Sequence, residues 1–263
     1  MSYWKQVIIR DVWAHNLEDE FNLIRQVIHQ HPFISMDTEF PGEIHSSPKI
    51  VYSCLKANVD ALKLIQIGLT LSDSSGNLPD FGSNNSYIWQ FNFSDFNVNS
   101  DPCNKLSIDM LRRQGIDFDR NFRDGVDSGR FAELMLWSGL VFNNDVVWVT
   151  FCGAYDFGYL VKVLTRKNLP NSLEDFLYLV EGLFGKSVYD MKHMMKYCYY
   201  LFGGLESVAS TLNVRRVVGN SHQAASDSLL TWHAFQKMME IHFMNNEATQ
   251  HAGVLFGLEI LAY

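Results

Sequence analysis

The 263-residue sequence has few cysteines and no long uninterrupted apolar run. Its four cysteines lie too far apart to form a CxxC pair: Cys54, Cys103, Cys152 and Cys198. We therefore expect reduced thiols in an intracellular protein rather than a disulfide or zinc framework. The first 22 residues lack the apolar block of a signal peptide, and no stretch reaches the roughly 18 apolar residues that a membrane-spanning helix needs. The sequence predicts no membrane association.

Basic residues are also scarce. Lysine and arginine number 21 against 29 aspartates and glutamates, which gives a formal net charge of −8. A protein that covers a long stretch of nucleic acid needs many contacts between basic side chains and phosphates. The charge excludes that class. If the protein acts on nucleic acid, the contact must be short and local, and cations or partners must assist it.

The apolar content is high enough for one large core, with 47% hydrophobic and 14% aromatic residues. Alternating and continuous apolar runs predict strands at 33–40, 64–72, 87–93, 146–151 and 187–189. Helical periodicity predicts helices at 17–30, 52–63, 105–114, 129–138, 155–166, 173–184, 190–200, 204–212 and 223–242. This order predicts a single α/β domain at 16–245, with a mixed sheet covered by helices. We expect residues 1–15 to be an extended lead-in. Residues 246–263 form a tail that either docks or is partly disordered.

Two carboxylates lie near the end of the first predicted strand, Phe33–Phe40. Because side chains on a strand alternate, Asp37 and Glu39 point to the same face. Two like charges so close repel each other, and one would stay protonated unless a cation lay between them. The pair is therefore either half of a metal site or a solvated strand edge, and by itself it does not decide between them.

Three later residues bear on that choice. Asp156 follows the buried strand 146–151 at the start of the next helix, where ligand groups gather in open α/β sheets. Asp227 lies near the start of the helix 223–242 among small residues that allow close approach to a sheet. His222 lies in the preceding loop. Each has an ordinary alternative, because acids favour helix N-termini and loop histidines are usually solvated. Arg215 and Arg216 could contact phosphate, but we expect them to lie in a solvated loop.

Taken together, four carboxylates come from three separate elements. Hard oxygen ligands without a Cys or His cluster select Mg²⁺ or Mn²⁺ over zinc. Two such ions about 4 Å apart are the usual device for phosphodiester cleavage, and a neutral histidine beside the attacking water can take its proton. The cations would also supply the positive charge that the acidic chain lacks.

The order Asp-x-Glu, Asp, His-x-Ala-x-x-Asp resembles the DEDDh exonucleases, whose fold is ribonuclease H-like. Over roughly residues 5–260 the chain is more closely similar to the poly(A)-specific ribonucleases, or deadenylases, associated with the CCR–NOT complex. The segments that carry this resemblance are Met36–Gly42, Lys63–Thr70, Trp89–Phe93, Tyr155–Leu160, Gly203–Leu205 and His222–Thr231.

The resemblance implies a ribonuclease H-like mixed sheet flanked by helices and a 3′-to-5′ exoribonuclease that shortens mRNA poly(A) tails and releases 5′-AMP. It implies that two divalent ions, Mg²⁺ or Mn²⁺, are held by Asp37, Glu39, Asp156 and Asp227. His222 would then orient or deprotonate the attacking water. Expected partners are the 3′ end of poly(A) RNA, a large helical scaffold subunit and a second nuclease that carries a leucine-rich repeat. The expected location is cytoplasm and nucleus.

The chain departs from this family at Cys152-Gly153, where relatives carry a His-Ser or similar pair. An alternative function is therefore an adaptor that bridges another nuclease to the scaffold with little activity of its own. A third is a DNA-directed exonuclease, because the 2′-hydroxyl contacts that select RNA cannot be located in the sequence.

Overall fold

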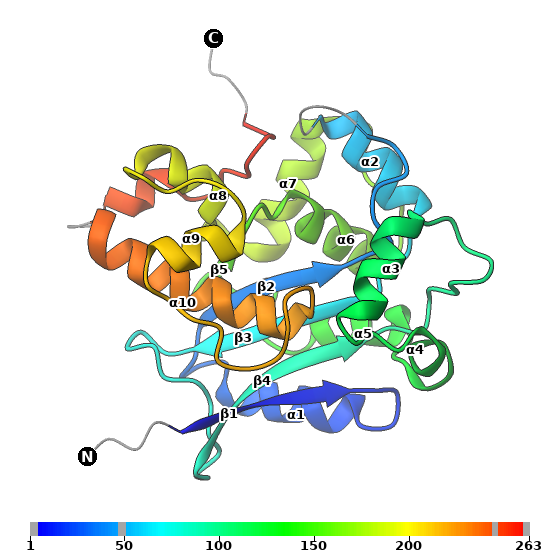
Figure 1. The fold of residues 1–263 in the computed structure, drawn as a ribbon, viewed down its shortest axis with the longest axis horizontal. Coiled ribbons are helices and arrows are strands. Elements are labelled where there is room, and N and C mark those ends of the chain that lie inside the picture. Colours follow the sequence, from blue (N-terminus) through cyan, green and yellow to red (C-terminus); the bar gives the residue numbers. More distant parts are fainter. Residues whose placement is uncertain (1–4, 47–50, 244–246, 260–263) are drawn as a thin grey trace.

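The computed structural model describes residues 5–46, 51–243 and 247–259. Its centre is a six-stranded mixed sheet (Figure 1). The strands are β1 (Gln6–Val12), β2 (Phe33–Glu39), β3 (Gln66–Ser72), β4 (Asn85–Asn92), β5 (Val147–Thr150) and β6 (Val188–Asp190). Their order is β1-β4-β3-β2-β5-β6. The central strand β2 runs antiparallel to β3 and parallel to β5.

Helices cover both faces of the sheet. One face packs on α1 (Leu17–Val27), α2 (Tyr52–Ala61), α5 (Ser128–Leu136), α6 (Ala154–Thr165) and α7 (Leu173–Phe184). The opposite face packs on α8 (Met191–Met194), α9 (Leu205–Thr211) and α10 (Ala224–His242). Beyond the end of the sheet where β2 and β4 finish, α3 (Lys105–Arg113) and α4 (Phe118–Asp124) share a smaller core (Figure 1). Short 3-10 turns lie at Met195–Tyr197 and Glu247–His251.

Strand β2 sends its apolar and acidic residues to opposite faces. Ile34 and Met36 are fully buried in the core that contains α6 and α7. Strand alternation turns Asp37 and Glu39 to the other face, which α10 covers. The same pleat that completes the core therefore places two carboxylates beneath α10.

Helix α10 comes unusually close to the sheet at Gly68 of β3. A β-carbon built on Gly68 would lie 2.0 Å from the main-chain carbonyl of Ala224. Gly68 also pairs directly with Asp37 of β2. Only glycine leaves room here for main chain against main chain. The predicted role of the small residues around Asp227 is confirmed, since they let the first turn of α10 lie against the carboxylate strand.

The predicted ribonuclease H-like mixed sheet is confirmed, as are its five expected strands and the long helices. Three expectations are wrong. Residues 6–12 are not a lead-in, because β1 pairs in parallel with β4 along its whole length. The sequence missed α4, which is only seven residues long. The helix expected at 190–200 is reduced to α8 and one 3-10 turn, because the chain returns to an extended conformation at Cys198.

The described part of the C-terminal segment, 247–259, docks on the fold. Val254 forms a parallel bridge with Tyr189 of β6, and Leu255 and Leu258 are buried in the core. Of the expected lead-in and tail, residues 1–4, 246 and 260–263 lie outside the described residues. Among the helices that the structure describes, none is both long and apolar enough to cross a bilayer.

Candidate active site

The structure brings the predicted site residues together from three elements. Asp37 and Glu39 lie at the end of β2, Asp156 in the first turn of α6, and Asp227 in the first turn of α10. Ligand atoms of Glu39, His222 and Asp227 all lie within 4.8 Å of one another. Glu39, Asp156 and Asp227 are buried, whereas Asp37 keeps partial exposure. The cluster is therefore compact, with access from solvent at Asp37.

The charges of the cluster repel each other. Burial raises the pKa of Asp37 well above its usual range, and the neighbouring carboxylates of Asp227, Asp156 and Glu39 raise it further. Burial likewise raises the pKa of Glu39, with added repulsion from Asp227 and Asp156. Such mutual influence requires short distances between the four groups. The solvated-edge interpretation of the β2 pair is wrong, since Glu39 is buried and both Asp37 and Glu39 lie in the field of Asp156 and Asp227.

Asp156 is held from the opposite side of β2. The hydroxyl of Thr38 donates to its Oδ1 at 2.6 Å. Burial raises the pKa of Asp156 to about 7, and the hydrogen bond from Thr38 opposes that rise. Thr38 lies between the two acidic residues of β2 and points to the face of α6. One short strand segment thus supplies two members of the cluster and orients a third.

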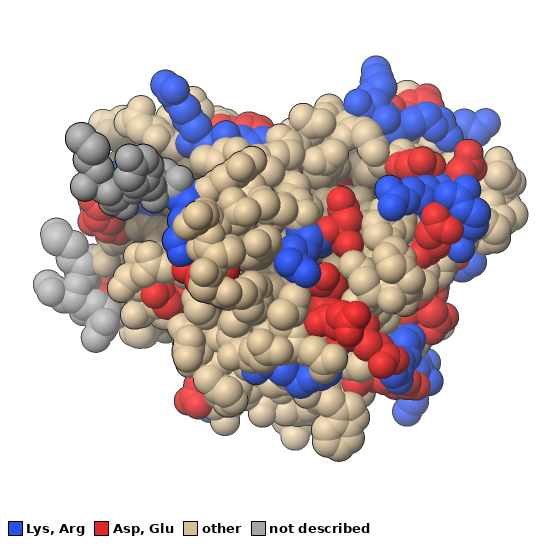
Figure 2. All heavy atoms as spheres, turned by 90° about the horizontal axis from the view of Figure 1, so that it is seen from below, with Lys and Arg blue, Asp and Glu red and all other residues tan. Residues whose placement is uncertain are grey.

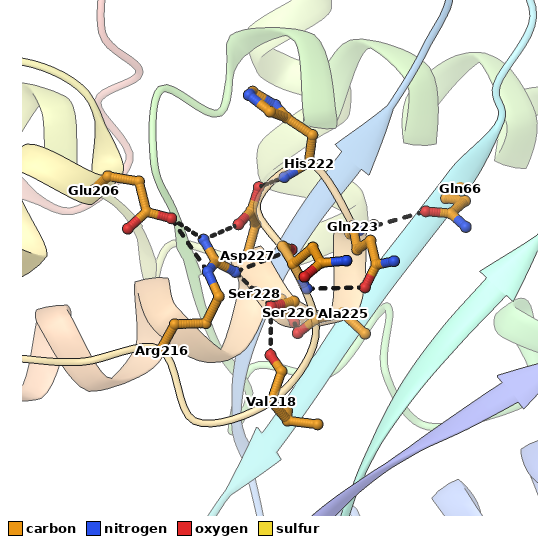
Figure 3. Close-up of polar contacts among 12 residues, drawn as sticks. Gln66, Glu206, Arg216, Val218, His222, Gln223, Ala225, Ser226, Asp227 and Ser228 are labelled. Carbon is orange, nitrogen blue, oxygen red and sulfur yellow. Dashed lines mark hydrogen bonds and ion pairs between the residues drawn. The ribbon is translucent and has the colours of Figure 1, made fainter. Parts of the chain in front are cut away.

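Asp227 has a cationic partner that the sequence did not predict. The guanidinium of Arg216 contacts Asp227 Oδ1 at 2.5 Å and also pairs with Glu206 at the start of α9. Figure 3 shows this guanidinium between the two carboxylates, with Ser226 beside it. Burial raises the pKa of Asp227, and Arg216 lowers it. The expectation of a solvated loop is wrong for Arg216, whose side chain is only 15% exposed.

His222 is fixed by its own main chain. Its backbone N–H donates to Asp227 Oδ2 at 2.9 Å, and its φ of 59° is in the left-handed region. Gln223 anchors the same loop, since its amide donates to the carbonyl of Gln114 at 2.8 Å and accepts from the N–H of Asn220 at 3.0 Å. The loop therefore presents the imidazole to the cluster in one defined backbone conformation.

Cys152 and Gly153, where the chain departs from the family pattern, contact a second buried carboxylate, that of Asp190. Its two oxygens accept the N–H groups of Cys152 and Gly153, each at 3.0 Å. Burial raises the pKa of the Cys152 thiol to about 12, so the thiol stays protonated and is a poor nucleophile. A signal for Asp190 exists in the sequence, because it directly follows the predicted strand 187–189, and ligand groups gather at strand ends in α/β sheets.

The donor set fits divalent cations. Four carboxylates and one imidazole converge, while Arg216 is the only cation whose charge bears on Asp37 among the described residues. Figure 2 shows acidic and basic side chains interspersed over one face, without a continuous basic surface. Carboxylate oxygens are the ligands that Mg²⁺ and Mn²⁺ prefer. Asp37, Glu39, Asp156 and Asp227 are therefore the groups that would hold such ions.

Relatives are similar over nearly the whole chain. The Arabidopsis thaliana protein "Probable CCR4-associated factor 1 homolog 10" is 48% identical over 261 residues, covering 97% of this chain and 93% of the relative. "Poly(A) ribonuclease pop2" of Schizosaccharomyces pombe is 42% identical, covering 95% of this chain and 75% of the relative.

Known structures agree with this. The S. pombe Pop2p structure in its Mg²⁺- and Mn²⁺-bound form superposes with a TM-score of 0.87 at 41% identity, covering 95% of this chain and 99% of that one. Yeast CAF1, co-crystallised with the NOT1 MIF4G domain, superposes with a TM-score of 0.79 at 32% identity, covering 95% of this chain and 96% of that one. E. coli exonuclease I superposes with a TM-score of 0.54 at 14% identity, covering 79% of this chain and 40% of that one. It shares the fold.

The model of one ribonuclease family matches residues 12–130, which include β2 with Asp37 and Glu39. The remaining site residues lie within the span of the full-length relatives. With the fold, the converging carboxylates and this similarity, the chain belongs to the CAF1 family of ribonucleases.

Proposed function

We propose that this protein is a divalent-cation-dependent 3′-to-5′ exoribonuclease that shortens poly(A) tails and releases 5′-AMP by two-metal hydrolysis. The observation that carries the proposal is the convergence of Asp37, Glu39, Asp156 and Asp227 beside His222. The names of the relatives support the substrate, since one is a poly(A) ribonuclease.

The residues of the site have different roles in this proposal. Asp37 and Glu39 offer oxygens from the sheet, Asp156 from α6, and Asp227 from α10. Two bound Mg²⁺ or Mn²⁺ ions would lower the pKa of a water and stabilise the charge on the leaving oxygen. His222, held by its N–H on Asp227, is placed to orient that water or to accept its proton. The imidazole is within reach of the cluster but need not be a ligand, because hard cations prefer oxygen.

We further propose that the protein works in a CCR–NOT complex, on a scaffold of the NOT1 type. A relative at 32% identity has been co-crystallised with a NOT1 MIF4G domain. The leucine-rich-repeat nuclease partner and the cytoplasmic and nuclear location remain proposals that rest on the family resemblance alone.

The test is a cleavage assay with labelled oligoadenylate RNA and Mg²⁺. The wild-type protein should give a ladder shortened from the 3′ end and release 5′-AMP. EDTA and the Asp37→Ala substitution should each abolish it. Equal cleavage by wild type and Asp37→Ala would overturn the proposed site, and a preference for DNA over RNA would overturn the proposed substrate.

The same variants separate a nuclease from an adaptor. An adaptor needs its docking surface but not its carboxylates, so Asp37→Ala/Asp156→Ala would still restore tail shortening in cells that lack the protein. We expect instead that the double variant co-purifies with the scaffold and fails to restore shortening.

A further inference from the structure

A polar cavity lies beside the active site on the same face of the sheet. Its volume is about 200 Å³, and it opens between the edge strand β1, the start of α10 and the α3–α4 connection. Its lining is unusually rich in side-chain amides, contributed by Gln66, Gln90, Asn92, Asn121 and Gln223. None of these groups is a proposed metal ligand or takes part in the proposed proton transfer.

The strand register connects this cavity to the carboxylates. Glu39 of β2 pairs with Gln66 of β3, and Gln66 pairs with Asn92 of β4. Directly paired residues point to the same face, so these three side chains form a row across the sheet. Two strand spacings separate the ends of the row, about 10 Å. At the other side, Gln223 directly follows His222 in sequence. The cavity is therefore within reach of a nucleotide close to the reacting one.

Hydrogen bonds hold most of these side-chain amides in place, but one amide oxygen, that of Gln90, has no donor among the described residues. Gln66 donates to Asn92 Oδ1 at 2.7 Å, and Gln90 donates to Asp11 Oδ1 at 3.0 Å. The carbonyl oxygen of Gln90 is buried and has no hydrogen-bond partner in the described part of the chain. Gln90 is only 8% exposed. A buried acceptor without a donor costs about 1–3 kcal/mol, so a ligand that donates here would be favoured.

The rest of the cavity favours a flat ligand that donates hydrogen bonds. The guanidinium of Arg120 lies 4.0 Å above the ring of Trp13, and both residues line the cavity. Asp11 and Asp117 line it too and are exposed, which adds carboxylate acceptors. Bases are commonly held by stacking on aromatic or guanidinium planes, with amides reading their edges. Gln and Asn in particular match the donor and acceptor pattern of adenine.

We propose that this cavity is a base-binding subsite that takes a nucleobase with an exocyclic amino group, namely an adenine of the RNA substrate next to the 3′ end. The inference rests on the proposed function and extends it to specificity. The amino group of adenine donates to the free oxygen of Gln90 and to Asp11. Guanine and uracil present a carbonyl oxygen at the corresponding position, which faces acceptors and is rejected.

The test compares cleavage of oligoadenylate with RNAs that carry one purine riboside, which lacks the amino group, at successive positions from the 3′ end. With wild type, kcat/KM should fall at least tenfold at one position near the 3′ end and little elsewhere. The near-isosteric Gln90→Met should remove most of this difference while leaving the Mg²⁺-induced rise in Tm unchanged. Gln26→Met, on the exposed face of α1, is the matched control and should behave as wild type.

Two results would overturn the subsite. One is that wild type cleaves all the substituted RNAs equally. The other is that Gln90→Met slows every RNA by the same factor, which would mark Gln90 as merely structural. If wild type cleaves no RNA at all, the proposed function fails. The subsite is then judged by binding, where the preference of wild type for oligoadenylate over oligouridylate should be lost in Gln90→Met. Equal binding of both RNAs by wild type would overturn it.

Discussion

Two buried acidic regions of this molecule look alike in the sequence and differ completely in the fold. Asp190 ends β6 and is fully buried, and its carboxylate accepts four backbone N–H groups, those of Cys152, Gly153, Lys192 and Phe256. Asp37 lies near the end of β2 among three other carboxylates. In the described residues no hydrogen bond lowers its pKa, and Arg216 is the one group that does so.

The contrast separates an acid with a structural role from one that we propose binds a metal ion. The four donors around Asp190 replace its lost water and tie β5, α8 and the C-terminal segment to one point. Asp37 has no such set of donors, and Arg216 is one cation beside four carboxylates, so the fully charged form of the cluster requires a further cation. Burial of a carboxylate by itself therefore does not mark an active site. The distinguishing feature is whether the protein itself supplies the groups that compensate the buried charge.

The largest effect is expected for the Asp37→Asn substitution. We expect cleavage of oligoadenylate to fall by about 1000-fold or more, because the substituted amide cannot balance the charge of a bound cation. The Tm of the metal-free protein should stay the same or rise, since one repulsive charge is removed. Activity assays and thermal unfolding in EDTA check both effects. A loss of metal-free stability would mean that the cluster is structural.

The opposite pattern is expected for Asp190→Asn. An amide places an NH₂ group against backbone donors, and hydrogen bonds to a charged acceptor contribute about 1.5–3 kcal/mol each. The free energy of unfolding should therefore fall by about 3 kcal/mol or more, as measured in urea. The folded fraction should still show a Tm increase with Mg²⁺. Loss of that increase in folded protein would place Asp190 in the metal site.

Gly68→Ala tests whether the closeness of α10 to β2 matters. The added β-carbon would collide with the main chain of Ala224, and overpacking of this kind costs about 1–3 kcal/mol. Because α10 carries Asp227, metal affinity measured by calorimetry should also weaken. Gly182→Ala in α7 is the control, since a β-carbon there meets nothing within 4 Å. It should stabilise by roughly 0.5–1 kcal/mol without changing metal affinity.

The most gradual expected effect is on pH dependence. Asp156 has a pKa raised from 3.8 to about 7 in the metal-free fold, so between these values the folded state holds a proton that the unfolded state has lost. Its contribution to stability is therefore full below that window and is lost as the pH rises towards 7, by at most about 1.4 kcal/mol per pH unit.

Thermal unfolding in EDTA should show this decline between about pH 4 and 7, and saturating Mg²⁺ should reduce or reverse it, because cations displace the proton. The pKa of Asp190 is also raised by burial, but Mg²⁺ should leave its contribution unchanged. An identical pH profile with and without Mg²⁺ would contradict the assignment of Asp156 to the metal site.

Much of the site could be predicted from local patterns. The alternation in Phe33–Glu39 was sufficient to place Asp37 and Glu39 on one face, and the position of Asp156 after a buried strand was sufficient to place it at the sheet end. Arg216 was missed because nothing in its neighbourhood distinguishes a solvated loop arginine from one drawn to a buried acid. Strand β1 was missed because its pairing is with β4, some 80 residues away in sequence.

Hydrophobic periodicity and residue chemistry are local properties, so they were sufficient to predict five of the six strands in the described sheet, the long helices and the carboxylate residue set. Which acids share a site depends on the tertiary structure. Asp190 and Asp37 are both acids at or near strand ends, yet Asp190 meets four backbone donors and Asp37 meets three carboxylates. That difference depends on contacts between distant segments, such as α10 against Gly68, and no local pattern encodes it.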